Sequence, residues 1–236
     1  MLMPVESPRK KASGLLPLAN GDRMSQPEFH RRYKAYPEGV KIELIGGVVY
    51  MASPMRMPHS RYDSELGNPF ITYRKRTPVV EELRGATTIL GRKSEPQPDL
   101  GLRILTEFGG TSHIDVEEYI VGPPELLGEI AYSTRAMDLY QKRDDYRKAG
   151  VAEYIVLCVE EKRLRWLDFK GRCEIEPDDQ GVFRSRVFPG LWIDGPALLA
   201  RDTRAVEKVI RRGLRSPEHA DFVRRLMRAK RLGDTP

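Results

Sequence analysis

The sequence contains no long apolar run and very little cysteine. None of its apolar stretches approaches the roughly 18 residues that a membrane-spanning helix needs. The two cysteines, Cys158 and Cys173, show neither Cys-x-x-Cys spacing nor a neighbouring histidine cluster, which argues against a disulfide framework or a zinc site. We therefore expect a soluble chain in which both cysteines are packing residues.

Several motifs that identify other enzyme classes are also missing. The sequence has no Walker A loop, no Gly-x-Gly-x-x-Gly turn and no Gly-x-Ser-x-Gly elbow, so it gives no indication of those nucleotide-binding or acyl-transfer sites. Its 236 residues, 40% of them apolar, suffice for one main core with a sizeable sheet. Residues 1–22 read as a flexible tail with too short an apolar stretch for a secretory signal, so we expect a cytoplasmic protein.

Positive charge is concentrated in the C-terminal segment. Residues 201–236 hold 11 Lys and Arg against 5 Asp and Glu, which accounts for the whole net charge of +6. The pattern over 199–236 predicts a basic helical extension made of two helices, broken at 213–217. Such a segment could follow nucleic-acid phosphates, or it could be a solvated appendage that packs on the core or contacts a partner. The candidate nucleic-acid-binding residues are Arg211, Arg212, Arg215, Arg224, Arg225 and Arg228.

An acid lies inside a short apolar run at residues 126–131. This run, "LLGEIA", has the length of a strand and contains Glu129. A buried carboxylate is costly unless it meets a cation, a metal or several hydrogen-bond donors, so burial of Glu129 would require a partner. An edge strand with Glu129 facing water is the alternative.

A helical pattern follows, from Asp138 to a helix-ending Gly150. Asp138 is placed as an N-terminal cap or first-turn acid. At about 100° per residue, Lys142 falls within the apolar stripe that includes Tyr146, which we interpret as a packing residue. Lys142 is therefore predicted to point towards the core, although a lysine in this position could also extend into water. The strand pattern after Gly150 then leads into a hairpin, so the whole is typical of a βαβ unit in which Glu129 and Lys142 converge.

A second acid precedes another predicted strand. Pro98-Asp99 leads into an alternating pattern, which places Asp99 at the start of that strand. Asp99 and Glu129 at neighbouring strand ends would provide oxygen ligands suited to Mg²⁺ or Mn²⁺, and Lys142 would add a positive charge beside a phosphate. This combination suits phosphodiester hydrolysis, in which a metal activates water and a lysine stabilises developing charge.

Four motifs occur in an order that resembles a known family. They are "KIELIGGVVYMASPMRMPHS", Pro98-Asp99, the Glu129-to-Lys142 stretch with its Lys-x-x-x-Tyr-x-x-x-Gly-Val run, and "FPGLWID". Over roughly residues 24–195 the chain resembles the Uma-type "putative restriction endonuclease" family, a bacterial branch of the PD-(D/E)XK nuclease superfamily. The resemblance implies an α/β (α+β) restriction-endonuclease-like domain over 23–198, a mixed β-sheet flanked by helices. It also implies Asp99 and Glu129 as metal ligands.

The chain departs from the superfamily pattern in two places. The lysine that usually follows two residues after the second acid is replaced by Ala131, and Lys142 matches the position of family members whose lysine lies on the following helix. The "AYST" turn after Glu129 is one residue shorter than the family's Ser-Pro-Ser-Thr-like run, which leaves the geometry of this turn open.

Glu43 and His59 also match recurrent positions of the family. The resemblance implies an auxiliary acid at Glu43, on a strand beside a Gly-Gly turn, and a phosphate or water contact at His59. The alternatives are that Glu43 pairs with a cation and that His59 caps the next helix.

The first interpretation is an endonuclease that acts on DNA and depends on Mg²⁺ or Mn²⁺. By default we expect it to be a homodimer, because enzymes of this kind often dimerise to cut two strands. A non-catalytic nucleic-acid-binding or partner-docking protein that retains the fold is the second. A hydrolase acting on another phosphodiester is the third.

Overall fold

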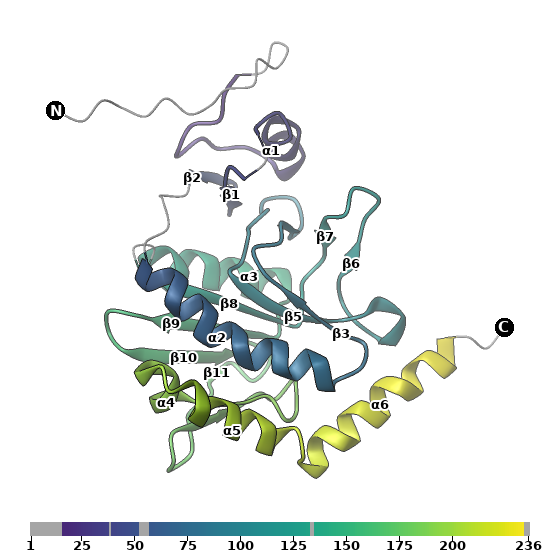
Figure 1. The fold of residues 1–236 in the computed structure, drawn as a ribbon. Coiled ribbons are helices and arrows are strands. Elements are labelled where there is room, and N and C mark those ends of the chain that lie inside the picture. The colour runs from purple at the N-terminus through teal and green to yellow at the C-terminus, as the bar shows by residue number, and fades with distance from the viewer. Residues whose placement is uncertain (1–15, 38, 52–56, 133–134, 234–236) are drawn as a thin grey trace.

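The computed structural model describes residues 16–37, 39–51, 57–132 and 135–233 of the chain (Figure 1). The first 15 residues of the predicted tail lie outside the described residues. The turn residues 133 and 134, whose geometry the sequence left open, do so too. Leu18 is already buried in a small core and its N–H donates to the hydroxyl of Tyr36, so ordered packing begins within the predicted tail.

Within the described residues, six strands form the main sheet. In spatial order they are β11 (Cys173–Glu174), β10 (Arg163–Asp168), β9 (Glu153–Cys158), β8 (Leu126–Ala131), β5 (Leu100–Ile104) and β3 (Val80–Leu83). β8 and β9 are parallel, and the other neighbours are antiparallel. The sheet is therefore mixed, and the predicted α+β class is confirmed.

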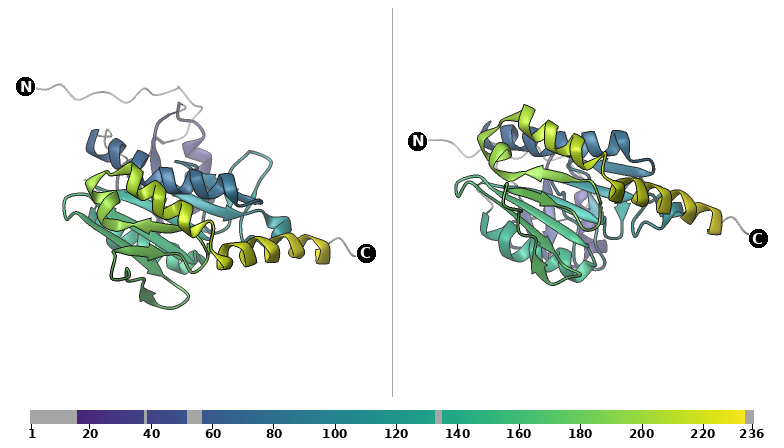
Figure 2. Two further views of the ribbon diagram at one scale, coloured as in Figure 1. Left: turned by 60° about the horizontal axis from the view of Figure 1, so that its bottom comes forward. Right: turned by 90° about the horizontal axis from the view of Figure 1, so that it is seen from below.

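Helices cover both faces of this sheet (Figures 1 and 2). They are α2 (Met57–Arg76), α3 (Arg143–Ala149), α4 (Gly195–Ala200), α5 (Thr203–Gly213) and α6 (Pro217–Gly233), with a 3₁₀ turn η1 (Thr106–Phe108) and a π-helix η2 (Met137–Lys142). A further helix, α1 (Gln26–Tyr33), belongs to a separate small core. Because strand side chains alternate, β8 directs Leu126 and Ile130 to the core beneath α2 and α5, and Leu127 and Ala131 to the core beneath η2 and α3.

Three small sheets surround the main one. They are β1 (Ile42–Ile45) with β2 (Val48–Met51), β4 (Thr88–Ile89) with β7 (Ile120–Val121) and β6 (His113–Ile114), and β12 (Val182–Arg184) with β13 (Trp192–Asp194). The β1–β2 hairpin turns at Gly46 and Gly47, whose φ angles are 59° and 84°. Two consecutive positive φ values fit a tight hairpin turn and favour glycine at both positions, and they confirm the predicted Gly-Gly turn beside Glu43.

The C-terminal helices α5 and α6 are separated between Gly213 and Pro217, where the sequence pattern predicts the break. They are not a detached appendage. Val206 and Ile210 of α5, together with Phe222 and Leu226 of α6, belong to the largest hydrophobic core. Removal of residues 201–236 would therefore expose that core as well as delete charge.

The cysteines behave differently from one another. Cys158 is buried in β9, as a packing residue should be, whereas Cys173 is exposed on the edge strand β11. The prediction for Cys173 is therefore wrong, because a strand pattern does not reveal that its strand lies at the edge of the sheet. Among the described residues, none of the helices has the length and apolar character needed to cross a membrane.

Candidate active site

Neighbouring strands bring the two predicted metal ligands together. Glu129 lies on the α3 side of β8, between Leu127 and Ala131. The antiparallel register pairs Leu100 with Gly128, so one further step sets Asp99 beside Glu129 on the same face. The N–H of Ile130 donates to Asp99 Oδ2 at 2.9 Å, which ties the start of β5 to β8. The alternative of an edge strand with Glu129 in water is excluded, since β8 lies inside the sheet and Glu129 is 2% exposed.

Lys142 completes this pair from the helical side. Its Nζ lies 3.0 Å from Glu129 Oε1, 3.1 Å from Glu43 Oε1 and 3.8 Å from Asp138 Oδ1. The side chain is only 4% exposed. The structure thus places Lys142 towards the core, as its position in the apolar stripe predicts, and not extended into water.

The helix that carries Lys142 differs from the prediction in its first half. Met137–Lys142 forms a π-helix, and the α-helix α3 follows it from Arg143. Asp138 lies in the first turn, as predicted, and it is buried beside Lys142. A periodicity of 100° per residue cannot reveal the wider π-turn, a feature often found at functional sites. The predicted end is correct, since Gly150 caps α3 with a φ of 99°.

Tyr146 is both a packing residue and a member of the site. Its ring packs edge to face against Tyr154 in the core beneath α3. Its hydroxyl donates to Glu129 Oε1 at 2.7 Å. Burial and the nearby Glu129 carboxylate raise the pKa of this hydroxyl, which keeps it a hydrogen-bond donor. The sequence pattern predicts only the packing role, although the i, i+4 spacing from Lys142 places both residues on one face.

The β1 strand contributes one acid, and the residue that precedes it contributes one base. Glu43 Oε1 accepts hydrogen bonds from Lys142 Nζ and from the backbone N–H of Gln97, the latter at 2.7 Å. Lys41, two residues earlier, places its Nζ 3.5 Å from Asp99 Oδ1, with 31% of its side chain exposed. Lys41 was missed in the sequence, although strand alternation sets it on the same side as Glu43.

His59 reaches the site from the first turn of α2. Its Nε2 lies 3.1 Å from Asp99 Oδ2, so its ring contacts Asp99 and is not used as a cap. The other ring nitrogen, Nδ1, is buried without a hydrogen-bond partner among the described residues. His59 can therefore orient Asp99 through one nitrogen and offer the other to a water.

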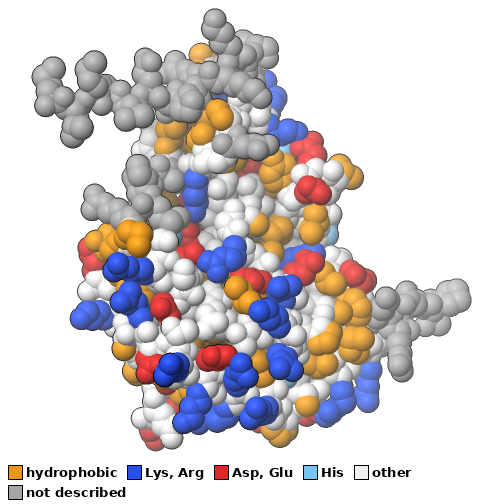
Figure 3. All heavy atoms as spheres, in the orientation of Figure 1, with side chains coloured by type: hydrophobic (Ala, Val, Ile, Leu, Met, Phe, Trp, Pro, Cys, Tyr) orange, Lys and Arg blue, Asp and Glu red, His pale blue; other side chains and the backbone are white. Residues whose placement is uncertain are grey.

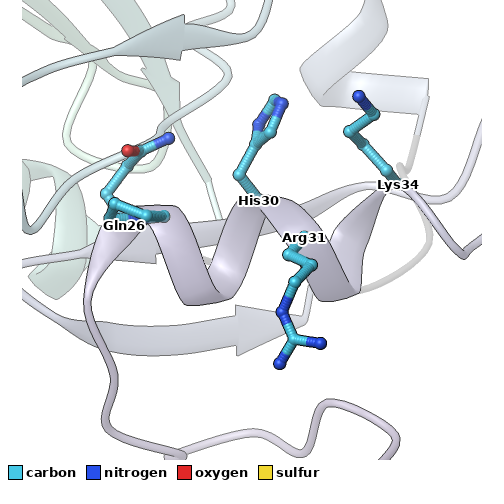
Figure 4. Close-up of a pocket in the computed structure, with 5 residues that line it drawn as sticks. Gln26, His30, Arg31 and Lys34 are labelled. Atoms are coloured by element: carbon cyan, nitrogen blue, oxygen red, sulfur yellow. The ribbon is translucent and has the colours of Figure 1, made fainter. Parts of the chain in front are cut away.

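Helix α1 fixes the segment that leads to Asp99 (Figure 4). Gln26 Nε2 donates to Glu95 Oε2 at 2.8 Å, and His30 Nδ1 lies 2.9 Å from Glu95 Oε1. Glu95 also exchanges backbone hydrogen bonds with Leu44. Figure 4 shows Gln26 and His30 on the same side of α1, with Arg31 directed away. The small hollow beside these residues thus belongs to a structural anchor.

The cluster carries more acid than base. Four carboxylates surround it, on Glu43, Asp99, Glu129 and Asp138, and two ammonium groups, on Lys41 and Lys142. Such an excess of negative charge favours the binding of a cation.

Burial and neighbouring charge move the pKa values of these groups in different directions. Burial alone would raise the pKa of Asp99, but the hydrogen bond from His59, the charge of Lys41 and the Ile130 N–H together hold it well below its usual range. Burial raises the pKa of Glu129 despite Lys142. Burial alone would lower the pKa of Lys142, but Glu129 and Glu43 raise it, so Lys142 stays charged.

Two carboxylate oxygens remain for a metal ion. The hydrogen bonds of the described residues use Glu129 Oε1 and Asp99 Oδ2, and leave Glu129 Oε2 and Asp99 Oδ1 without one. Asp99 Oδ1 faces the partly exposed Lys41 ammonium group at 3.5 Å. The described part of the chain holds no group of three or more histidine, cysteine, aspartate or glutamate side chains arranged as a metal site. A pair of carboxylates still fits Mg²⁺, which commonly takes one or two and fills its other positions with water and substrate oxygens.

The six predicted nucleic-acid-binding arginines lie elsewhere. All six are exposed, on α5, on α6 and between them. Arg211 pairs with Glu207, Arg224 pairs with Asp221, and Arg212 packs over the ring of Trp192. No interaction of the described residues connects them to the acid cluster. Their candidate role would therefore be to bind substrate away from the reacting bond.

Comparison with known proteins identifies a family and a fold. Residues 26–198 match the sequence model of the Uma2 family, described as "Putative restriction endonuclease". Among solved structures, the chain is similar to "a putative nuclease belonging to DUF820 from Anabaena variabilis ATCC 29413", with a TM-score of 0.57 and 14% identity, covering 72% of this chain and 96% of that chain. At this identity the likeness shows the fold alone. No curated protein matches.

Proposed function

The chain belongs to the Uma2 family, and from this premise we propose that it is a metal-dependent endonuclease that hydrolyses DNA phosphodiester bonds. The observation that carries the proposal is the convergence of Asp99, Glu129 and Lys142, which come from two strands and a helix. A structural role alone would not account for two acids beside a buried lysine, each with an oxygen that accepts no hydrogen bond from the described residues.

Asp99 and Glu129 would hold the metal, through Asp99 Oδ1 and Glu129 Oε2. Bound Mg²⁺ or Mn²⁺ would supply Lewis acidity towards the scissile phosphate and lower the pKa of an attacking water. Lys142 and Tyr146 position the Glu129 carboxylate by donating to its Oε1. Glu43 in turn positions Lys142.

Lys41 and His59 complete the proposed mechanism. Lys41 is more exposed than Lys142 and is not held between carboxylates on every side, so it is the cation suited to contact a phosphate oxygen. His59 orients Asp99, and its buried Nδ1 can hold a water near the reacting phosphate.

The proposed catalytic unit is residues 23–198, with 199–236 as a basic helical extension that contributes substrate contacts. Cleavage of both strands of a duplex requires two sites, and a homodimer would provide them. The proposed substrate is DNA in a bacterial cytoplasm.

A binding protein that has kept the fold is the second candidate. The observation that favours it is that Lys142 and Tyr146 both donate hydrogen bonds to Glu129 Oε1. A carboxylate oxygen that already accepts two hydrogen bonds is a poor ligand for a metal ion.

Plasmid cleavage separates the two candidates. Supercoiled plasmid and single-stranded DNA are incubated with Mg²⁺ or Mn²⁺ and with wild type, Asp99→Asn, Glu129→Gln or Lys142→Met. The matched controls are Asp144→Asn and Lys148→Met on α3, where the Asp144 side chain is partly exposed and Lys148 is exposed. The nuclease predicts metal-dependent nicking that each site variant abolishes and each control retains. Binding of DNA without any nicking would establish the second candidate.

A further inference from the structure

A basic groove lies at the end of α2 that is remote from His59. The last turns of α2 and α5 and the start of α6 enclose a hollow of about 590 Å³. Its basic side chains come from two helices, Lys75 and Arg76 from α2, and Arg211 and Arg215 from the end of α5 and the turn after it. Figure 2 shows α2 and α5 side by side, and Figure 3 shows Lys and Arg gathered over this lower part of the surface.

Most of the positive charge in this groove is not neutralised by the protein. Glu207 is the acid in its lining, and it pairs with Arg211. Within the described residues, Lys75, Arg76 and Arg215 have no ion pair, and all three are exposed. Basic residues in the last turn of a helix offset the helix dipole. That effect, however, does not require further cations from a second helix.

The neutral lining also suits an anion. Asn68 and Thr72 of α2 add amide and hydroxyl donors between the charged side chains. Phosphate contacts in nucleic-acid complexes use this mixture of Lys, Arg, Asn and Thr. A membrane-binding surface would instead present several large apolar side chains, and this lining offers only Ile71 and Leu214, both half-buried.

One helix connects the groove to the candidate active site. Sixteen residues separate His59 from Lys75, which corresponds to roughly 24 Å along an α-helix. Successive phosphates of a duplex strand advance by about 3.4 Å. The groove and the candidate active site are therefore separated, along α2, by a distance comparable to about seven base pairs of duplex DNA.

We propose that the groove formed by Lys75, Arg76, Arg211 and Arg215 binds the phosphate backbone of duplex DNA on one side of the scissile bond. This proposal rests on the proposed endonuclease function and adds to it the surface that holds the substrate. It also divides the six predicted arginines, because only Arg211 and Arg215 line this groove. Arg212 lies over Trp192, which Arg184 also contacts.

The test measures binding without catalysis. A fluorescently labelled duplex of about 24 base pairs, long enough to span both surfaces, is titrated with full-length protein in EDTA over a range of salt concentrations. The test variant is Lys75→Gln with Arg215→Gln. The matched control is Lys170→Gln with Arg172→Gln, which removes the same charge from exposed positions of the turn between β10 and β11. Thermal unfolding verifies that both proteins fold.

The expected result is specific to the groove. Loss of two phosphate contacts should lower the salt slope of binding by about 2 and weaken affinity by about tenfold, whereas the control stays within about twofold of wild type. Equal losses in both variants, or none in the test variant, would overturn the proposal. So would binding to vesicles containing phosphatidylserine that exceeds DNA binding and is lost in the same variant.

These outcomes are independent of the proposed chemistry. A protein that cleaves plasmid but shows no groove effect refutes the groove alone. A protein that cleaves nothing but shows the groove effect refutes the nuclease and retains the phosphate-binding surface.

Discussion

The Nζ of Lys142 lies 3.0 Å from Oε1 of Glu129, and both side chains are almost completely buried. Thirteen residues separate them in the chain, and the strand β8 and the π-helix η2 bring them together. Glu43 and Asp138 add two further carboxylates around the same ammonium group. Lys142 is thus a structural counter-ion as well as a candidate for chemistry.

Replacement of Lys142 should strongly destabilise the fold. Lys142→Met would leave Glu43, Glu129 and Asp138 buried without their shared cation, and the loss of one partner from a buried ion pair costs about 3–5 kcal/mol. Urea denaturation of this variant should show that loss, while exposed Lys148→Met should stay within about 0.5 kcal/mol of wild type. Equal stability of the two variants would show that the cluster needs no internal cation.

Lys41 should behave in the opposite way. Because its side chain is partly exposed, Lys41→Met should change the free energy of unfolding by less than about 1 kcal/mol. If Lys41 contacts the phosphate, the same variant should lower kcat/KM for plasmid nicking about tenfold or more, the value of one charged hydrogen bond. Exposed Lys93→Met is the control. Unchanged kinetics of Lys41→Met would remove Lys41 from the mechanism.

Two neighbouring tyrosines allow a matched comparison. Tyr146 donates to the carboxylate of Glu129, whereas Tyr154 donates to the backbone oxygen of Asp138 at 3.0 Å. Both Tyr146→Phe and Tyr154→Phe should cost roughly 1–3 kcal/mol of stability. Only Tyr146→Phe should also reduce the rate of metal-dependent nicking by more than the stability loss explains. If Tyr146→Phe and Tyr154→Phe lowered the nicking rate equally, the role of Tyr146 would be limited to packing.

Metal binding should be measurable without DNA. A ligand that binds only the folded state stabilises it by about 2.7 kcal/mol at 100 times its Kd. Mn²⁺ should therefore raise the Tm of wild type and of the partly exposed surface control Asp144→Asn, and EDTA should reverse the shift. Asp99→Asn and Glu129→Gln should show no such increase. A shift that persists in both variants would place the metal elsewhere.

His219 should make stability depend on pH. Its Nδ1 lies 3.0 Å from the backbone oxygen of Leu214 and its Nε2 lies 2.9 Å from the hydroxyl of Thr77, and burial lowers its pKa below the ordinary 6.5. The unfolded chain therefore binds a proton more readily, so the contribution of His219 is complete above about pH 6.5 and is lost as pH falls below it. Calorimetry should show a smaller loss of Tm between neutral and acidic pH for His219→Gln than for wild type. A difference of the opposite sign would contradict this assignment.

The sequence predicts much of the site because its strongest signals are local. Strand alternation places Glu129, helical phase places Lys142, and a Pro-Asp pair places Asp99; the structure brings all three together. The family predicted from the motifs is confirmed by the match over residues 26–198. What these residues do in a reaction remains a prediction.

The residues that were missed depend on tertiary contacts. Lys41 reaches Asp99 only because the β1–β2 hairpin packs over the start of β5, and no local pattern contains that arrangement. The hydroxyl of Tyr146 was assigned to packing because periodicity identifies a face and not the atom at its end. Arg212 lies over Trp192, whereas Arg215 lines the groove beside α2. This difference likewise depends on tertiary packing and not on the local sequence.

The position of Lys142 on a helix has a consequence for how such sites can diverge. Ala131, at the position where the superfamily pattern has its lysine, is buried in the same core as Leu139 and Tyr154. Apart from Glu129, β8 therefore contains only apolar residues and glycine. The ammonium group is supplied by a separate element, and its position is set by the turns that precede it. Insertions, deletions or changes of helical winding between residues 132 and 142 could therefore alter the chemistry in evolution while the sheet keeps its sequence.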